Sequence, residues 1–260
     1  ERLLVSDGNS VLFNQANFSS FKPASFISGT SSYLIGIKQG NPAQQFPTLV
    51  SVLTYDGNLF NVTSVVIGYY VTTPPVLRKT ITESYQLLVG TNEGKILTFN
   101  FNELLSGNAI PSETTVEAGV ELTQLALVDL KVFAIGSRND SNSKYDLVYS
   151  DGQVIKFNDE KLLKLSLARD SQGNDLAIVS SDKNNSYQAY VIQSNLVSNK
   201  FALPSLESAK SYSLSDVKND GNTYFVTSSN DKLYSYSLNG SLAENFPFTA
   251  PESESFTGLP

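Results

Sequence analysis

Residues 210–248 read KSYSLSDVKNDGNTYFVTSSNDKLYSYSLNGSLAENFPF and contain the signals of four consecutive short strands. Polar and apolar residues alternate within this stretch, as is typical of half-buried strands. Asn239 and Gly240 stand between two such segments, and Asn-Gly favours a hairpin because both residues tolerate a positive φ. The four predicted strands span residues 211–217, 223–228, 232–238 and 244–248. We therefore expect one antiparallel four-stranded unit here.

The central hairpin of this unit recurs along the chain. Copies with short turns span residues 2–13, 86–99 and 146–157, and the last could be the outer hairpin of its unit. Two copies with longer loops pair residues 33–37 with 49–55 and residues 175–181 with 187–193. The six turns fall near residues 8, 42, 93, 152, 184 and 230, a mean spacing of about 44 residues, and one four-stranded propeller blade takes ~40–50 residues. The sequence predicts an all-β fold, a β-propeller of about six four-stranded blades, with seven as the alternative.

We expect residues 1–260 to form a single propeller domain, which could be a segment of a longer chain. The stretches before the hairpins supply the first strand of a blade, at residues 64–71, 122–128, 162–168 and 211–217. Residues 255–260 stand where a further first strand would begin. Pairing of the N- and C-terminal strands could close the ring and remove exposed sheet edges, and a chain simply cut at this point is the alternative.

Only two stretches, residues 102–105 and 159–163, have the pattern of a helical turn. Residues 72–84 form a long insertion with a character of its own. Pro74 and Pro75 favour an extended backbone there, and Arg78 and Lys79 make a small basic spot on an acidic protein. The insertion is predicted to be a solvated loop on the rim of the fold, or else part of a docking surface.

The composition excludes several chemistries. A net charge of −7 argues against nucleic acid, because binding to phosphates needs a basic patch. The chain has no Cys and no His, which excludes disulfides, thiolate or imidazole metal ligands and any catalytic triad based on His. No run of apolar residues is long enough to insert into a membrane. Carboxylates, Lys, Tyr, Ser and Thr are the remaining candidate catalytic groups.

The end of the 210–248 unit, with Asn239-Gly240-Ser241 and then Phe246-Pro247, resembles the FG-GAP/VCBS and PQQ-like propeller repeats of secreted bacterial proteins. The full pattern is present once, and fragments of it recur in the other five units. The resemblance implies a propeller fold, and it says little of function because propellers have many unrelated activities.

The resemblance also implies where calcium would bind. Members of the FG-GAP family often have an acidic calcium loop, and Asp216 and Asp220 match its pattern, whereas Lys218 and Tyr224 stand where oxygen ligands are needed. We therefore expect an ordinary turn, with Asp216 and Asp220 as the calcium candidates. PQQ enzymes use a Trp-rich docking motif, and this chain has no Trp, so no cofactor is expected.

Carboxylate pairs are the remaining route to an enzyme, because glycosidases need two acids at a fixed separation. Six Asp residues are predicted in turns of neighbouring blades, where two could converge: Asp129, Asp140, Asp146, Asp151, Asp170 and Asp175. Asp is also a favoured turn residue, so ordinary turns are the preferred explanation for them. Strand aromatics such as Tyr69, Tyr70, Phe99, Phe101, Tyr234 and Tyr236 could stack on sugars or form the core.

Two functions from different classes are compatible with these observations. The first is a non-catalytic secreted or cell-surface scaffold that binds a protein or a glycan and could be a subunit of an envelope complex. Its expected location is extracellular, on the cell surface or in the periplasm. Its candidate interaction loops contain Asn41, Gln45, Phe46, Arg78 and Lys79. The alternative is a glycan-cleaving propeller enzyme that uses carboxylates.

Overall fold

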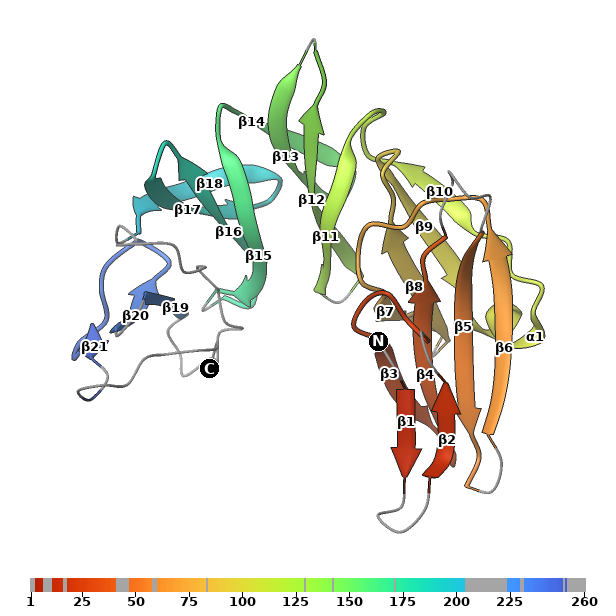
Figure 1. Cartoon of the computed structure of the whole chain (residues 1–260). Helices are drawn as coiled ribbons and strands as arrows, with labels where there is room; N and C mark the ends of the chain where they lie inside the picture. The colour runs from red at the N-terminus through yellow and green to blue at the C-terminus, as the bar shows by residue number, and fades with distance from the viewer. Residues whose placement is uncertain are drawn as a thin grey trace. The chain divides into compact units, whose positions relative to one another are not determined.

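The computed structural model describes residues 3–6, 11–15, 18–40, 47–57, 60–82, 84–128, 130–141, 143–170, 172–203, 224–229, 232–249 and 251. The chain divides into two compact units, Glu1–Leu125 and Ala126–Pro260. Both consist almost entirely of antiparallel sheets (Figure 1). The described part of the chain contains one α-helix, α1. No helix in that part has the length and apolarity needed to cross a membrane.

The first unit begins with a hairpin of β1 (Leu3–Ser6) and β2 (Val11–Gln15). A four-stranded sheet follows, with β3 (Ala24–Ser28), β4 (Ser31–Lys38), β5 (Thr48–Tyr55) and β6 (Phe60–Ile67) paired in chain order. The next sheet pairs β7 (Val76–Lys79), β8 (Tyr85–Gly90), β9 (Lys95–Asn100) and β10 (Ser112–Thr115). Helix α1 (Phe101–Ser106) connects β9 to β10.

The third sheet pairs β11 (Glu121–Val128), β12 (Lys131–Asn139), β13 (Lys144–Ser150) and β14 (Gln153–Asn158). The fourth pairs β15 (Lys161–Arg169), β16 (Asp175–Lys183), β17 (Ser186–Gln193) and β18 (Leu196–Ala202). A last sheet has three described strands, β19 (Tyr224–Ser229), β20 (Lys232–Ser237) and β21 (Phe248–Thr249). The described residues thus form six sheets, which matches the six predicted units, and four of the sheets have four strands.

Apolar cores lie between sheets that follow each other in the chain. In the first unit, Ile35 and Val52 of one sheet pack in a cluster with Leu87 and Phe99 of the next. In the second unit, Val179 belongs to the cluster shared with the third sheet, and its neighbour Ile178 belongs to the cluster shared with the last sheet. Because successive strand residues point to opposite faces, both faces of the fourth sheet are buried.

The predicted hairpins are confirmed, and residues 146–157 are the outer hairpin of their sheet, formed by β13 and β14. The first strands predicted at 122–128 and 162–168 are also confirmed, as β11 and β15. Residues 211–217 and 255–260 lie outside the described residues, so closure of the ring by the two ends of the chain stays a prediction.

The first strand predicted at residues 64–71 is wrong. That stretch contains the end of β6, the last strand of the preceding sheet, and β7 is the first strand of the next one. The prediction of a solvated loop at 72–84 is also wrong, because this stretch contains β7. Pro74 and Pro75 precede the edge strand β7 without interrupting it, and Thr73 accepts a hydrogen bond from Gly90 N through its hydroxyl, 2.8 Å long.

Two smaller elements differ from expectation. Residues 159–163 are not helical, because Asp159 turns the chain with a φ of 59° and β15 begins at Lys161. The fourth strand predicted at 244–248 is reduced to β21, since Phe246 N donates to Ala243 O in a turn. The helical turn at 102–105 is confirmed as α1, which the Asn100 side chain caps and Gly107 ends with a φ of 77°.

Candidate functional site

The site lies in the first unit, where turns of two sheets meet α1. Phe26 and Tyr33 are cross-strand partners on β3 and β4, on either side of the turn that joins these strands. Tyr85 begins β8, just after the β7–β8 turn, and Phe101 begins α1. In this antiparallel sheet β7 and β9 run in the same direction, so the last residues of both strands lie at the same end of the sheet. The β7–β8 turn and α1, which follow these residues, are therefore neighbours.

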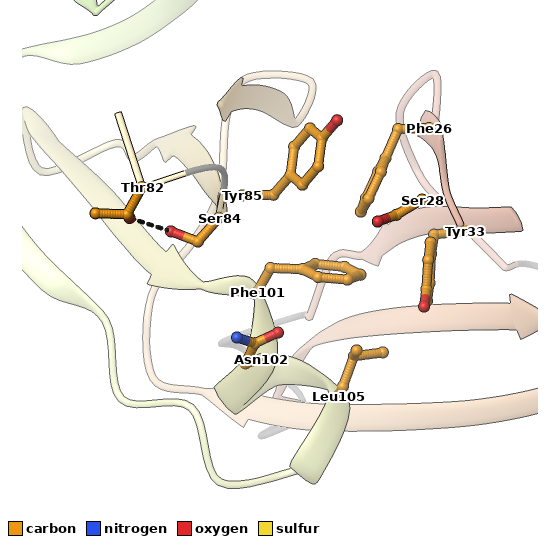
Figure 2. A pocket seen from close by; sticks show the side chains of 9 residues that line it. All are labelled: Phe26, Ser28, Tyr33, Thr82, Ser84, Tyr85, Phe101, Asn102 and Leu105. Atoms are coloured by element: carbon orange, nitrogen blue, oxygen red, sulfur yellow. Dashed lines mark hydrogen bonds between the residues drawn. The ribbon is translucent and has the colours of Figure 1, made fainter. Parts of the chain in front are cut away.

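The four aromatic rings form one contiguous cluster. Phe26 stacks on Tyr33 with a centroid distance of 4.9 Å and on Tyr85 with a distance of 4.1 Å. Phe101 packs edge-on against Phe26 at 4.8 Å and against Tyr33 at 5.1 Å. These are the arrangements that the ring quadrupole favours, each worth about 0.5–1.5 kcal/mol beyond the area buried. The cluster is therefore a preorganised surface (Figure 2).

A pocket of about 300 Å³ opens beside these rings, and Figure 2 shows the side chains around it. Phe101 is buried, whereas Phe26, Tyr33 and Tyr85 are only partly covered and so remain accessible. Among the residues that the structure describes, no charged side chain lines the pocket. The described lining is Phe26, Ser28, Tyr33, Thr82, Ser84, Tyr85, Phe101, Asn102 and Leu105.

A network of hydroxyl groups fixes the rim of the pocket. Thr80 N donates to Ser84 O at 2.7 Å, and the hydroxyls of Thr80 and Ser84 lie 2.7 Å apart. Thr82 Oγ1 bonds both to Ser84 Oγ at 3.2 Å and to Thr80 Oγ1 at 3.0 Å. The same turn presents Ile81 to solvent with 86% of its surface exposed. The rim thus combines internally satisfied hydroxyls with one projecting apolar side chain.

Four polar groups at the pocket have no hydrogen bond within the part of the chain that the structure describes. They are the hydroxyls of Ser28, Tyr33 and Tyr85 and the side-chain amide of Asn102. Each hydroxyl can donate one hydrogen bond and accept another, and the amide offers two N–H donors and a carbonyl acceptor. The pocket therefore offers hydrogen-bonding groups as well as apolar surface.

The candidate interaction residues divide into two groups. Asn41, Gln45 and Phe46 lie outside the described residues, as do the calcium candidates Asp216 and Asp220. Arg78 and Lys79 lie on the edge strand β7, not in a loop. The Arg78 guanidinium donates to Gln86 Oε1 on β8, from Nε at 3.0 Å and from a terminal nitrogen at 2.6 Å. Neither basic residue lines the pocket.

Three of the predicted carboxylates, Asp140, Asp170 and Asp175, are bonded to nearby donors. Asp140 pairs with Arg138 Nε at 2.6 Å. Asp175 is the first residue of β16, so the predicted turn is wrong there, and it pairs with Arg169 Nε at 2.9 Å. Asp170 accepts from Asn174 and Gln193 side chains, at 2.8 and 2.9 Å, and these hydrogen bonds, led by those of Asn174, hold the pKa of the carboxyl below its usual value.

The other three predicted aspartates, Asp129, Asp146 and Asp151, differ in their positions. Asp146 lies within β13 and not in a turn, so the prediction of a turn is wrong there; its Oδ2 accepts from Leu162 N at 2.6 Å. Asp151 is in a turn, with a φ of 42°, and Asp129 is outside the described residues. Within the described ranges no three acidic residues gather in a way that could hold a metal ion.

Glu160 is a further buried carboxylate that the sequence did not single out. Its side chain is 8% exposed, and it accepts from Tyr190 OH at 2.6 Å and from Ser181 Oγ at 3.2 Å. Lys183 Nζ lies 3.6 Å from the other oxygen. Burial and the bond to Glu160 raise the pKa of Tyr190. These groups satisfy one another, which is what a buried carboxylate requires.

The aromatics singled out in the sequence are mostly core residues. Phe99, Phe101 and Tyr236 are buried, which confirms the core interpretation for them, and burial raises the pKa of Tyr236 to about 12. Tyr70 is 37% exposed and does not line the pocket. The sequence did not indicate Phe26, Tyr33 and Tyr85 as site residues, because the hairpin of β3 and β4 meets the distant elements β8 and α1 only in the folded structure.

Comparison with known proteins supports the fold. No protein-family model matches the chain, and no curated protein sequence matches it either. A solved structure described as "Structure of Dos1 propeller" is similar at a TM-score of 0.50 and 12% identity, over 83% of this chain and 56% of that one. "Crystal structure of BBS1N in complex with ARL6DN, soaked with lead" is similar at a TM-score of 0.48 and 15% identity, over 96% and 88%.

Similarity at such low identity concerns the fold alone. Together with the antiparallel four-stranded sheets, the first of these comparisons identifies the fold as a β-propeller, as the repeat spacing predicted. This chain spans 56% of the Dos1 propeller chain. A relationship of this chain to FG-GAP/VCBS or PQQ-like repeats stays a prediction, since no family model matches.

Proposed function

We propose that this β-propeller is a non-catalytic binding module whose aromatic pocket holds an apolar segment of a partner protein. The observation that carries the proposal is the four-ring cluster of Phe26, Tyr33, Tyr85 and Phe101 beside a pocket of about 300 Å³. Partly exposed aromatic rings on a rigid scaffold are typical of protein-binding hot spots, because they bury a large area at little entropic cost.

The lining favours a protein over a glycan. A sugar ring carries many hydroxyls that lose water on binding and need partners in the site. Of the hydroxyls around this pocket, those of Thr82 and Ser84 already bond to each other. The described residues of the lining include no carboxylate or guanidinium, the groups that form strong charge-assisted bonds. An apolar segment with a few polar groups matches such a lining better.

Two observations support the non-catalytic part of the proposal. The sequence has neither His nor Cys, which removes the commonest general base and the thiolate nucleophile. Asp140, Asp170 and Asp175 each accept hydrogen bonds from neighbouring side chains, and none of them lines the pocket. A carboxylate-dependent glycosidase would instead need two acids beside its substrate.

We also propose a repeat family and a cellular location for this protein, both from its sequence. The Asn-Gly-Ser turn and the Phe-Pro pair at residues 239–247 support an FG-GAP-like or PQQ-like repeat of a secreted or cell-surface protein. Fractionation of cells that make the full-length protein, followed by immunoblotting, tests the location. Recovery only in the cytosolic fraction would contradict it.

Selection from a random peptide library displayed on phage tests the binding function. We expect peptides that bind the wild-type protein to lose most of their affinity for Leu105→Glu, because this change places a charge beside the aromatic rings of the pocket. Tyr55→Ala is the matched control, because Tyr55 also stacks on a ring, Phe60 at 4.5 Å, in the same unit but outside the pocket. Selected peptides that bind both variants as well as the wild type would refute the pocket as the site.

A further inference from the structure

We infer that the pocket takes a proline-rich segment in the polyproline II conformation, flanked by basic residues. This inference rests on the proposed binding function and specifies its ligand. The first observation is the arrangement of the aromatic rings: Phe26 lies between Tyr33 and Tyr85 and stacks on both, so the three rings form one continuous row along the pocket (Figure 2). Extended proline-rich segments dock on aromatic surfaces of this kind, with the pyrrolidine rings packed against the aromatic rings.

The second observation concerns hydrogen bonding. A polyproline II segment makes no internal hydrogen bonds, so its carbonyl groups need donors from the partner, and Pro has no backbone N–H to satisfy. The described residues around the pocket supply donors that have no hydrogen bond of their own, namely the hydroxyls of Ser28, Tyr33 and Tyr85 and the amide of Asn102. Donors around an apolar surface are what such a segment requires.

The third observation concerns charge. The nine described lining residues are uncharged, so we expect the ligand residues that contact them to be uncharged as well. Glu103 follows Asn102 on the first turn of α1 and is exposed, and the chain as a whole has a net charge of −7. Basic residues beside the prolines would complement this negative charge and speed association.

A preformed polyproline II segment also loses little conformational entropy on binding.

Fluorescence anisotropy with defined peptides tests the inference. The first probe is a labelled peptide of six prolines with an Arg at each end, and the second has the same ends with the prolines replaced by alternating Ala and Ser. We expect the proline peptide to bind the wild-type protein at least about tenfold more tightly than the Ala-Ser peptide. Equal affinity for the two peptides would overturn the inference.

Variants separate the aromatic surface from its donors. Tyr85→Ala should weaken binding of the proline peptide about tenfold or more, because it removes a ring of the surface. Tyr85→Phe keeps the ring and removes only the hydroxyl, so a smaller loss of about fivefold is expected. Tyr55→Ala should bind as the wild type does. A loss that is the same in Tyr55→Ala and Tyr85→Ala would overturn the assignment to this pocket.

The outcomes distinguish this inference from the proposed function. If the proline peptide fails to bind while phage-selected peptides without proline bind through Leu105, the inference falls and the binding function stands. If neither kind of peptide binds and soluble glucan or mannan oligosaccharides do, both fall. Glu103→Gln should weaken the Arg-flanked peptide but not a peptide with Ser at both ends, and equal effects would refute the role of charge.

Discussion

Single residues decide how tightly the turns of this fold can close. Gly94 lies in the β8–β9 turn with a φ of 71°, and a Cβ atom there would overlap the Glu117 carbonyl oxygen. Gly29, in the β3–β4 turn, has a similar φ of 60° but no atom within 4 Å of such a Cβ. Substitution of Gly29 would therefore cost only the strained backbone conformation, whereas substitution of Gly94 would add a steric clash of the new Cβ atom with Glu117.

We expect Gly29→Ala to lower the free energy of unfolding by about 1–2 kcal/mol, the cost of a left-handed conformation for a residue with a side chain. Gly94→Ala should cost about 3 kcal/mol or more, because the Glu117 backbone must also move. Urea denaturation of both variants measures the difference. Equal losses would show that the turn around Gly94 relaxes freely.

The Asp170 carboxylate should make stability depend on pH. Its pKa in the folded state is lowered, chiefly by hydrogen bonds from Asn174, so its contribution is complete above the pKa of an unfolded Asp, about 3.9, and is lost as the pH falls through the folded value. We expect Asp170→Asn to melt lower than the wild type at pH 6, with a gap that narrows below about pH 4. A gap that stays constant down to pH 2.5 would contradict this.

At the scale of elements, α1 is stabilised by a local N-cap and supplies three of the residues that line the pocket. Asn100 Oδ1 accepts from Asn102 N at 2.9 Å, and Phe101, Asn102 and Leu105 of this helix line the pocket. Asn100→Ala should destabilise the protein by about 1 kcal/mol, the usual cost of losing an N-cap, and weaken binding at the pocket. Thermal melting and peptide anisotropy measure both effects. Asn61→Ala, at an exposed position on β6, is the control, and a loss as large there would refute the capping role.

Elements with local signals could be predicted, and elements defined by distant partners could not. The hairpins at 2–13 and 86–99 combine alternation with short Gly-containing turns, which are properties of adjacent residues. The edge strand β7 has four residues and follows two prolines, so its pairing with β8 leaves no pattern in the sequence. The pocket was missed for the same reason, since Phe26, Tyr85 and Phe101 meet only after two sheets have formed.

For the whole molecule, the single domain expected from the sequence predicts one cooperative thermal transition of the 260-residue chain. Calcium should leave this transition unchanged, because Lys218 and Tyr224 replace oxygen ligands in the loop of Asp216 and Asp220. Calorimetry with excess calcium and with a chelator measures both points. Two separate transitions would contradict the single domain, and a rise in Tm with calcium would identify a metal site.

The order of strands within each sheet has a consequence for synthesis of the protein. In all four four-stranded sheets, the paired strands follow one another along the chain, as the colour gradient in Figure 1 shows. Contacts within a sheet are therefore short in sequence, and short-range contacts form fast. A growing chain can complete each sheet soon after its residues leave the ribosome, and each finished sheet then offers an apolar face on which the next one assembles.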